Sequence, residues 1–168
     1  MLEILVVMHI WTITKWQKRF DIHDSTLRKG LYTRYDKDVD PEVKRACKEF
    51  CAWLRRNYYF PRRVVINFKR HEFITAMDGD LVSATFFGPF DMTEEPDIYI
   101  ATGDYLDRLE RRGKDFALTA ILASIVHELT HYFQWINGLN LTKRGEERQA
   151  RAYEDFLIYE YRETHAHP

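Results

Sequence analysis

Residues 116–138 read FALTAILASIVHELTHYFQWING, and this segment gives the clearest indication of the fold. It has no glycine or proline before Gly138, and Asp115 in front of it is a residue type that favours a helix N-cap. Gly138 is typical of the position just after a helix end. Because apolar residues flank the centre of the run on both sides, we predict a long helix over residues 116–136, buried within the domain.

This helix carries the pattern His-Glu-x-x-His at His127, Glu128 and His131. Residues four apart on a helix differ by only about 40° in direction, so both imidazoles can bind one metal ion. Glu128 lies beside the first ligand, where it can take a proton from water at the metal instead of binding the metal. Such a buried polar group is costly without a function. The pattern predicts a catalytic Zn²⁺ site with Glu128 as general base.

A catalytic zinc site also needs a third protein ligand and an open position. A histidine six residues after His131 would indicate the metzincin class, but that position is Asn137. We expect the next helix to begin at Glu146, after a short loop that brings its first turn close to the motif. We predict Glu147 as the third ligand, because it shares a helix face with the buried stripe. The alternatives are Glu154, His165 and His167, and we expect Glu146 to be a solvated charge in the first turn of the helix.

The remaining elements place this pair of helices in an α+β domain with a small sheet backed by helices. The predicted helices cover residues 41–57 and 105–111, and the predicted strands cover residues 64–68, 81–87 and 97–101. We expect residues 1–40 to be an N-terminal extension packed on the main domain, and residues 164–168 to be a polar tail. The opening MLEILVVMHIW indicates a buried strand.

The composition is typical of a soluble globular protein, with 45% hydrophobic and 30% charged residues and a net charge of -1. The near-zero charge does not favour nucleic acid or an anionic membrane as a partner. No apolar run approaches the roughly 20 residues of a membrane span. Cys47 and Cys51 are too few for a disulfide scaffold, so we expect a reduced cytoplasmic protein. We expect both cysteine side chains to take part in the ordinary packing of a helix.

The motif helix and the helix after it together resemble those of the gluzincins, zinc peptidases in which a helix-borne glutamate completes the site. Residues 127–132 and 147–153 look most like the compact minigluzincins and the IrrE/ImmA-type peptidases that cleave transcriptional repressors. The second motif is matched by Glu147, Ala150 and Tyr153. Arg151 is a departure, because related enzymes often carry Asp or Asn there to support a zinc-bound histidine.

This resemblance covers residues 41–163 and implies a zincin-like domain: a small mixed sheet with a backing helix, an HExxH active-site helix and a following glutamate helix. It implies a zinc metalloendopeptidase in which an extended peptide pairs with an edge strand, which residues 97–101 resemble. Glu128 would activate the water and then protonate the leaving amine. The candidate donors to the oxyanion are Tyr153, Tyr159 and Tyr161, and each can also be explained as a packing aromatic.

Two other functions fit the same residues. The first is a zinc-binding module that captures a protein partner without cleaving it, and the second is a latent enzyme held by its own terminus. The sequence leaves the substrate and the oligomeric state open.

Overall fold

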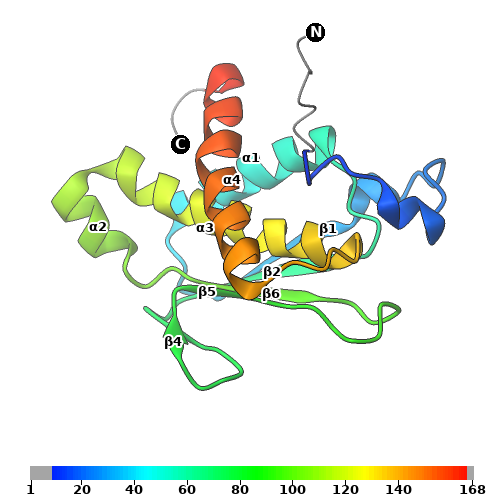
Figure 1. Ribbon diagram of the computed structural model, residues 1–168. Helices are drawn as coiled ribbons and strands as arrows, with labels where there is room; N and C mark the ends of the chain where they lie inside the picture. The colour runs from blue at the N-terminus through cyan, green and yellow to red at the C-terminus, as the bar shows by residue number, and fades with distance from the viewer. Residues whose placement is uncertain (1–8, 166–168) are drawn as a thin grey trace, which may run out of the picture.

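The structure, a computed structural model that describes residues 9–165, is a mixed α+β fold built on a four-stranded sheet (Figure 1). The strand order is β1-β2-β6-β5, in which the first three strands are parallel and β5 is antiparallel to β6. Their bounds are β1 Leu31–Tyr35, β2 Val64–Lys69, β5 Ala84–Phe87 and β6 Asp97–Ala101. A small hairpin of β3 (Ile74–Thr75) and β4 (Leu81–Val82) lies beside this sheet.

Four α-helices accompany the sheet, and α1, α3 and α4 lie on one of its faces (Figure 1). Their bounds are α1 Pro41–Asn57, α2 Tyr105–Arg112, α3 Lys114–Ile136 and α4 Lys143–Thr164. The predicted bounds of α1 are confirmed. This helix begins where Asp40 accepts a hydrogen bond of 2.8 Å from the backbone N–H of Glu42, with Pro41 at the first helical position.

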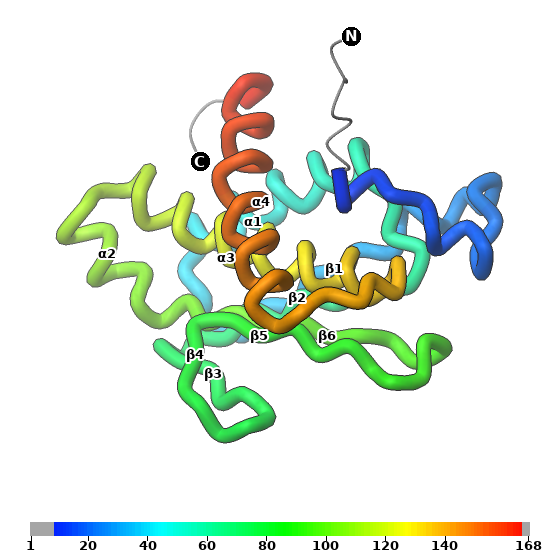
Figure 2. Tube along the Cα trace, viewed as in Figure 1, coloured from blue at the N-terminus to red at the C-terminus, as the bar shows by residue number. Residues whose placement is uncertain are grey.

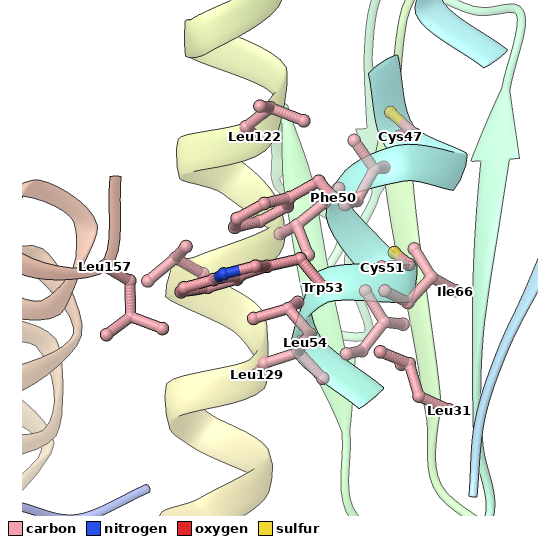
Figure 3. Close-up of a cluster of buried hydrophobic side chains, with 14 of the residues drawn as sticks. Leu31, Cys47, Phe50, Cys51, Trp53, Leu54, Ile66, Leu122, Leu129 and Leu157 are labelled. Atoms are coloured by element: carbon pink, nitrogen blue, oxygen red, sulfur yellow. The ribbon is translucent and has the colours of Figure 1, made fainter. Parts of the chain in front are cut away.

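The core between sheet and helices fixes the direction in which α3 presents its polar motif. Phe50 and Leu54 of α1 pack with Ile66 of β2 and with Leu122 and Leu129 of α3 (Figure 3), and all five are almost fully buried. Leu129 lies two residues from each motif histidine, which places it on nearly the opposite side of the helix. Its burial therefore turns both imidazoles away from the core.

By length and composition alone, α3 is the one helix in residues 9–165 that could span a membrane. This helix differs from the prediction that no apolar run approaches the length of a membrane span. In the fold, 61% of its most apolar 18-residue window is buried, because the core packs around it. A buried core helix passes the same test, so this feature is weak evidence for a membrane.

Two helix starts and one strand differ from the predictions. Helix α3 begins at Lys114 with Gly113 at its N-cap, so Asp115 lies in the first turn and not at the cap. Helix α4 begins three residues before Glu146, because the Thr142 hydroxyl accepts a hydrogen bond of 3.1 Å from the N–H of Gly145. The strand predicted over residues 81–87 is two strands, since β4 pairs with β3 and β5 pairs with β6.

Strand β1 was not predicted, and it lies within the segment expected to be an extension. It pairs with β2 from Leu31 opposite Val64 to Tyr35 opposite Phe68. Its single fully buried side chain, Leu31, gives too weak an apolar alternation to indicate a strand. Residues 1–8 of the expected opening strand lie outside the described residues, and residues 10–12 form a turn.

Burial should make both cysteines unreactive in the native protein. Cys47 and Cys51 are buried free thiols on α1, as expected from the sequence (Figure 3). Burial raises the pKa of the Cys51 thiol to about 12 and also raises the pKa of Cys47, so neither forms the nucleophilic thiolate at neutral pH. We expect mass spectrometry to find no iodoacetamide adduct on native protein at pH 8 and two adducts on unfolded protein. Rapid labelling of either native thiol would contradict this packing.

Candidate metal centre

Helices α3 and α4 bring together three side chains that could hold a metal ion. His127, His131 and Glu147 each offer one ligand atom, and these atoms all lie within 4.8 Å of one another. Oε2 of Glu147 lies 3.2 Å from Nε2 of His127, and Oε1 of Glu147 lies 3.2 Å from Nε2 of His131. Figure 2 shows the beginning of α4, which carries Glu147, crossing α3, which carries both histidines.

The turn between the two helices makes this crossing possible. Gly138 takes a φ of +60°, which L side chains rarely adopt, and its N–H donates to the carbonyl of Trp135. The N–H of Leu139 donates to the carbonyl of Gln134 and completes the end of α3. The chain then reverses, and the fully buried Ala150 turns the Glu147 face of α4 toward α3.

Each imidazole is held by its Nδ1 atom so that its Nε2 atom faces Glu147. Nδ1 of His127 lies 2.6 Å from a Glu154 oxygen, and Nδ1 of His131 lies 2.8 Å from the side-chain oxygen of Gln134. The Gln134 amide nitrogen donates in turn to the carbonyl of Glu146, which fixes its orientation. With hydrogen on Nδ1, each Nε2 keeps its lone pair for a metal ion.

The electrostatics of His127 reflect these partners. Burial lowers the pKa of His127, but the hydrogen bond to Glu154 and the charges of Glu128 and Glu147 outweigh this effect and raise it. The surroundings of the imidazole therefore favour a positive charge at this position, whether it is a proton or a metal ion.

The spacing of the ligand atoms can be compared with that of a metal site. With metal–ligand bonds of about 2.0–2.1 Å, neighbouring ligand atoms of a tetrahedron lie about 3.3 Å apart. Nε2 of His127 and Nε2 of His131 each lie 3.2 Å from a different oxygen of Glu147, and one ligand atom from each residue lies within 4.8 Å of the other two. The three residues could therefore hold one metal ion between them.

Glu128 is a buried carboxyl group beside this set, and none of the hydrogen bonds or ion pairs in residues 9–165 involves its side chain. Only 6% of the residue is exposed. Burial raises the pKa of Glu128 to about 7, His127 opposes the rise, and the charges of Glu147 and Glu154 add to it. A carboxyl group whose pKa is raised this far, beside a group of candidate metal ligands, is a candidate functional residue.

An open cleft of about 960 Å³ gives access to the group, and His127, Glu128, His131 and Glu147 all line it. The cleft supplies the open position that a catalytic metal requires. One end of it has an apolar wall, formed by Phe86, Phe90, Met92, Trp135 and Leu139.

The strand at the edge of the sheet beside the cleft is β5, and the expectation that residues 97–101 form this edge is wrong. Strand β6 is internal, because it pairs with β2 on one side and with β5 on the other. The N–H of Ala101 donates to the carbonyl of Ser83, so by the antiparallel alternation Thr85 and Phe87 face β6. Ala84 and Phe86 then direct their backbone polar groups to the free edge, and both line the cleft.

The alternative ligands have other contacts. The Glu154 carboxylate contacts Nδ1 of His127, and the Glu146 side chain is not part of the group of converging ligand atoms. His165 stacks on Tyr161 with ring centroids 4.5 Å apart, and its Nδ1 contacts the Thr164 hydroxyl. His167 lies outside the described residues.

None of the three tyrosines considered as oxyanion donors lines the cleft. The Tyr153 hydroxyl accepts a hydrogen bond of 2.7 Å from the N–H of Ile10 and so fixes the N-terminal segment to α4. Tyr161 is buried against Phe50 and Trp53, and Tyr159 is largely exposed. Their roles are in packing or at the surface.

The supporting residues were missed by the sequence analysis. Glu154 lies two helical turns after Glu147, which places both on one face of α4, and this spacing could have indicated its role. Gln134 had no such signal, because its contacts depend on how α4 crosses α3. Together these two residues contact the Nδ1 atoms of both histidines. No residue could be assigned this role from the sequence, because Arg151 stands where an Asp or Asn would have been expected to do so.

We expect Glu154→Ala to weaken metal binding by about 10–100-fold, the usual effect of removing a residue that orients a ligating imidazole. Competition with a chromophoric chelator measures this change. The matched control is Asp155→Ala, because Asp155 is the next acidic residue of α4 and is exposed. Equal affinities for both variants would show that the contact between Glu154 and His127 does not support the site.

A scan of protein-family models, a search of curated proteins and a search of solved structures all find no match to this chain. What residues 9–165 show is a mixed α+β fold with a His-His-Glu group that could hold a metal ion.

Proposed function

We propose that this protein is a zinc-dependent metallopeptidase of the gluzincin type on a zincin-like fold. His127, His131 and Glu147 are the metal ligands, and Glu128 is the general base. The observation that carries the proposal is the unpartnered Glu128 carboxyl group on the floor of an open cleft, beside three converging ligands.

Zinc is the metal that this donor set favours. Two imidazole nitrogens and one carboxylate, with a fourth position open to a cleft, are the ligands of catalytic zinc in several peptidases. When bound, zinc supplies a Lewis acid that acidifies water and polarises a carbonyl group. Glu154 and Gln134 support this choice, because they orient the two imidazoles as ligating histidines require.

The chain's own residues perform the remaining steps. The free backbone groups of Ala84 and Phe86 bind the substrate as an added strand, which positions a peptide bond over the cleft floor. Glu128 accepts a proton from the attacking water and delivers it to the leaving amine. The apolar wall around Trp135 offers apolar side chains to the substrate at one end of the cleft.

One observation favours a second candidate, a zinc-binding module that holds a protein partner without cleaving it. The tyrosines considered as oxyanion donors lie outside the cleft. Without such a donor, the edge strand and the apolar wall could still bind an extended segment of a partner.

Peptide cleavage with controlled metal content tests the proposal. The purified protein is stripped with a chelator, reloaded with zinc and incubated with unfolded casein, and the products are identified by mass spectrometry. We expect cleavage by the zinc-loaded protein, loss after chelation and recovery with zinc. Zinc binding without cleavage supports the second candidate, and failure to bind zinc contradicts both.

A further inference from the structure

A second hollow, of about 580 Å³, adjoins the metal group at the other end of the site. It shares His127, Glu128 and Glu147 with the cleft, but it extends along α3 toward Ala120, whereas the cleft extends toward Leu139. The metal group therefore lies between the two, with the apolar wall at one end and this hollow at the other.

Two arginines from different helices line the hollow: Arg108 of α2 and Arg151 of α4. Arg108 already has a partner, because its Nε atom lies 2.7 Å from an Asp104 oxygen. Arg151 is exposed, and none of the hydrogen bonds or ion pairs in residues 9–165 involves its guanidinium group. The hollow thus contains a cation without a protein counter-ion.

None of the three acidic residues of the hollow, Glu128, Glu147 and Glu154, forms an ion pair with Arg151 among the described residues, and two of them have other contacts. Glu147 faces the two imidazole Nε2 atoms, and Glu154 contacts Nδ1 of His127. A bound divalent cation would further offset their charge. The guanidinium group therefore remains available to an anion that enters the hollow from solvent.

The edge strand leads a substrate into this hollow. Ala84 lines both the cleft and the hollow, and Phe86 lines the cleft, so a peptide paired with β5 runs from one to the other. Its backbone crosses the metal group on the way. A residue just beyond the reacting bond on the Ala84 side comes next to Arg151.

We propose that Arg151, assisted by Arg108, is a specificity-determining residue that binds a substrate carboxylate on this side of the metal group. The inference rests on the proposed peptidase function and names its substrate class: peptides with a carboxylate at the Ala84 end of the site. A guanidinium group pairs with a carboxylate through two parallel hydrogen bonds, which gives it selectivity for this group. The carboxylate is either an Asp or Glu side chain or the peptide's free C-terminus.

The first test compares cleavage of a pool of synthetic peptides by zinc-loaded wild type and by Arg151→Glu. Mass spectrometry reads the residues flanking each cleaved bond. We expect wild type to prefer a carboxylate on one side of that bond, and Arg151→Glu to prefer lysine at the same position. The control is Arg148→Glu, which changes the same charge on an exposed part of α4 that lines neither the cleft nor the hollow. An identical preference in wild type and Arg151→Glu overturns the proposal.

Matched peptides distinguish the two sources of the carboxylate. One version of the best substrate replaces its acidic side chain by the amide, and another amidates its C-terminus. For the version that removes the recognised carboxylate, we expect kcat/KM of wild type to fall about tenfold, the effect of one charge-assisted pair. The same change should alter kcat/KM of Arg151→Gln less than about twofold. If neither version lowers the wild-type value, Arg151 does not bind the substrate.

A binding measurement separates failure of this inference from failure of the proposed function. The peptide pool is passed over immobilised zinc-loaded Glu128→Gln protein, with and without Arg151→Glu, so no cleavage is needed. Enrichment of carboxylate-bearing peptides that is lost with Arg151→Glu supports the subsite even if wild type hydrolyses nothing. Cleavage by wild type without such enrichment or preference is consistent with the proposed peptidase function and overturns the proposed carboxylate subsite at Arg151.

Discussion

Glu128→Gln will abolish peptide cleavage and leave the fold and the zinc content unchanged. General acid–base catalysis contributes about 10²–10⁴-fold to rate, so we expect kcat/KM to fall by at least this factor. The amide has nearly the same shape as the carboxyl group and fits the same buried position, but it cannot accept the proton. Single-turnover cleavage of a fluorogenic peptide and elemental analysis of the same sample measure both properties.

The control for this variant is Glu146→Gln, which makes the same chemical change near the site. Only the backbone carbonyl of Glu146 contacts the supporting network, so its side chain should be dispensable. We expect wild-type cleavage from Glu146→Gln. If Glu128→Gln cleaves as fast as wild type, Glu128 is not the base.

Removal of Glu147 will have the largest effect on zinc binding of any change on α4. Glu147→Ala leaves two histidines and solvent, so we expect affinity to fall by more than the roughly 100-fold upper range for a supporting residue. His127→Ala and His131→Ala should behave in the same way. A competition titration with a chromophoric chelator ranks these variants.

The ranking within α4 identifies the third ligand. We expect Glu147→Ala to lose the most affinity, Glu154→Ala to lose less and Glu146→Ala to lose none, because only Glu147 faces both Nε2 atoms. If Glu154→Ala releases the metal and Glu147→Ala retains it, Glu154 is the ligand and the assignment is wrong.

The helices could be predicted because their signals are local. Pro41 and the apolar stripe of α1 gave its bounds, and the run before Gly138 gave the end of α3. The predicted starts of α3 and α4 lie a few residues after the observed ones. For α3 the N-cap is Gly113, a residue type that gives little N-cap signal, and for α4 the N-cap Thr142 precedes a charged turn without an apolar stripe. The N-cap residue is hard to predict from the local sequence where several neighbouring polar residues could cap the helix.

The sheet was harder to predict because strand order depends on pairing between distant segments. The sequence indicated β6 as a strand, but its position inside the sheet follows from pairing with both β2 and β5. Strand β1 was missed because Tyr32, Thr33 and Arg34 do not give the apolar alternation of a half-buried strand. Such positions are set by the tertiary fold and not by local preference.

The metal group was largely predictable, and its surroundings were not. Helical periodicity alone places His127 and His131 on one side of α3, and a short loop brings the first turn of α4 close to them. The support from Gln134, and the place of Arg151 beside the metal group, depend on the crossing of the helices. The sequence pattern of a single segment does not predict contacts that depend on how two helices cross.

Anomalous diffraction from a crystal grown with one equivalent of zinc tests whether His127, His131 and Glu147 bind zinc. Data on both sides of the zinc absorption edge identify the metal and its position. We predict a single strong peak bonded to Nε2 of His127, Nε2 of His131 and the Glu147 carboxylate at about 2.0–2.1 Å, with Glu128 nearby and not bonded to it. No peak between these three residues, or zinc bound only elsewhere on the chain, would contradict the account.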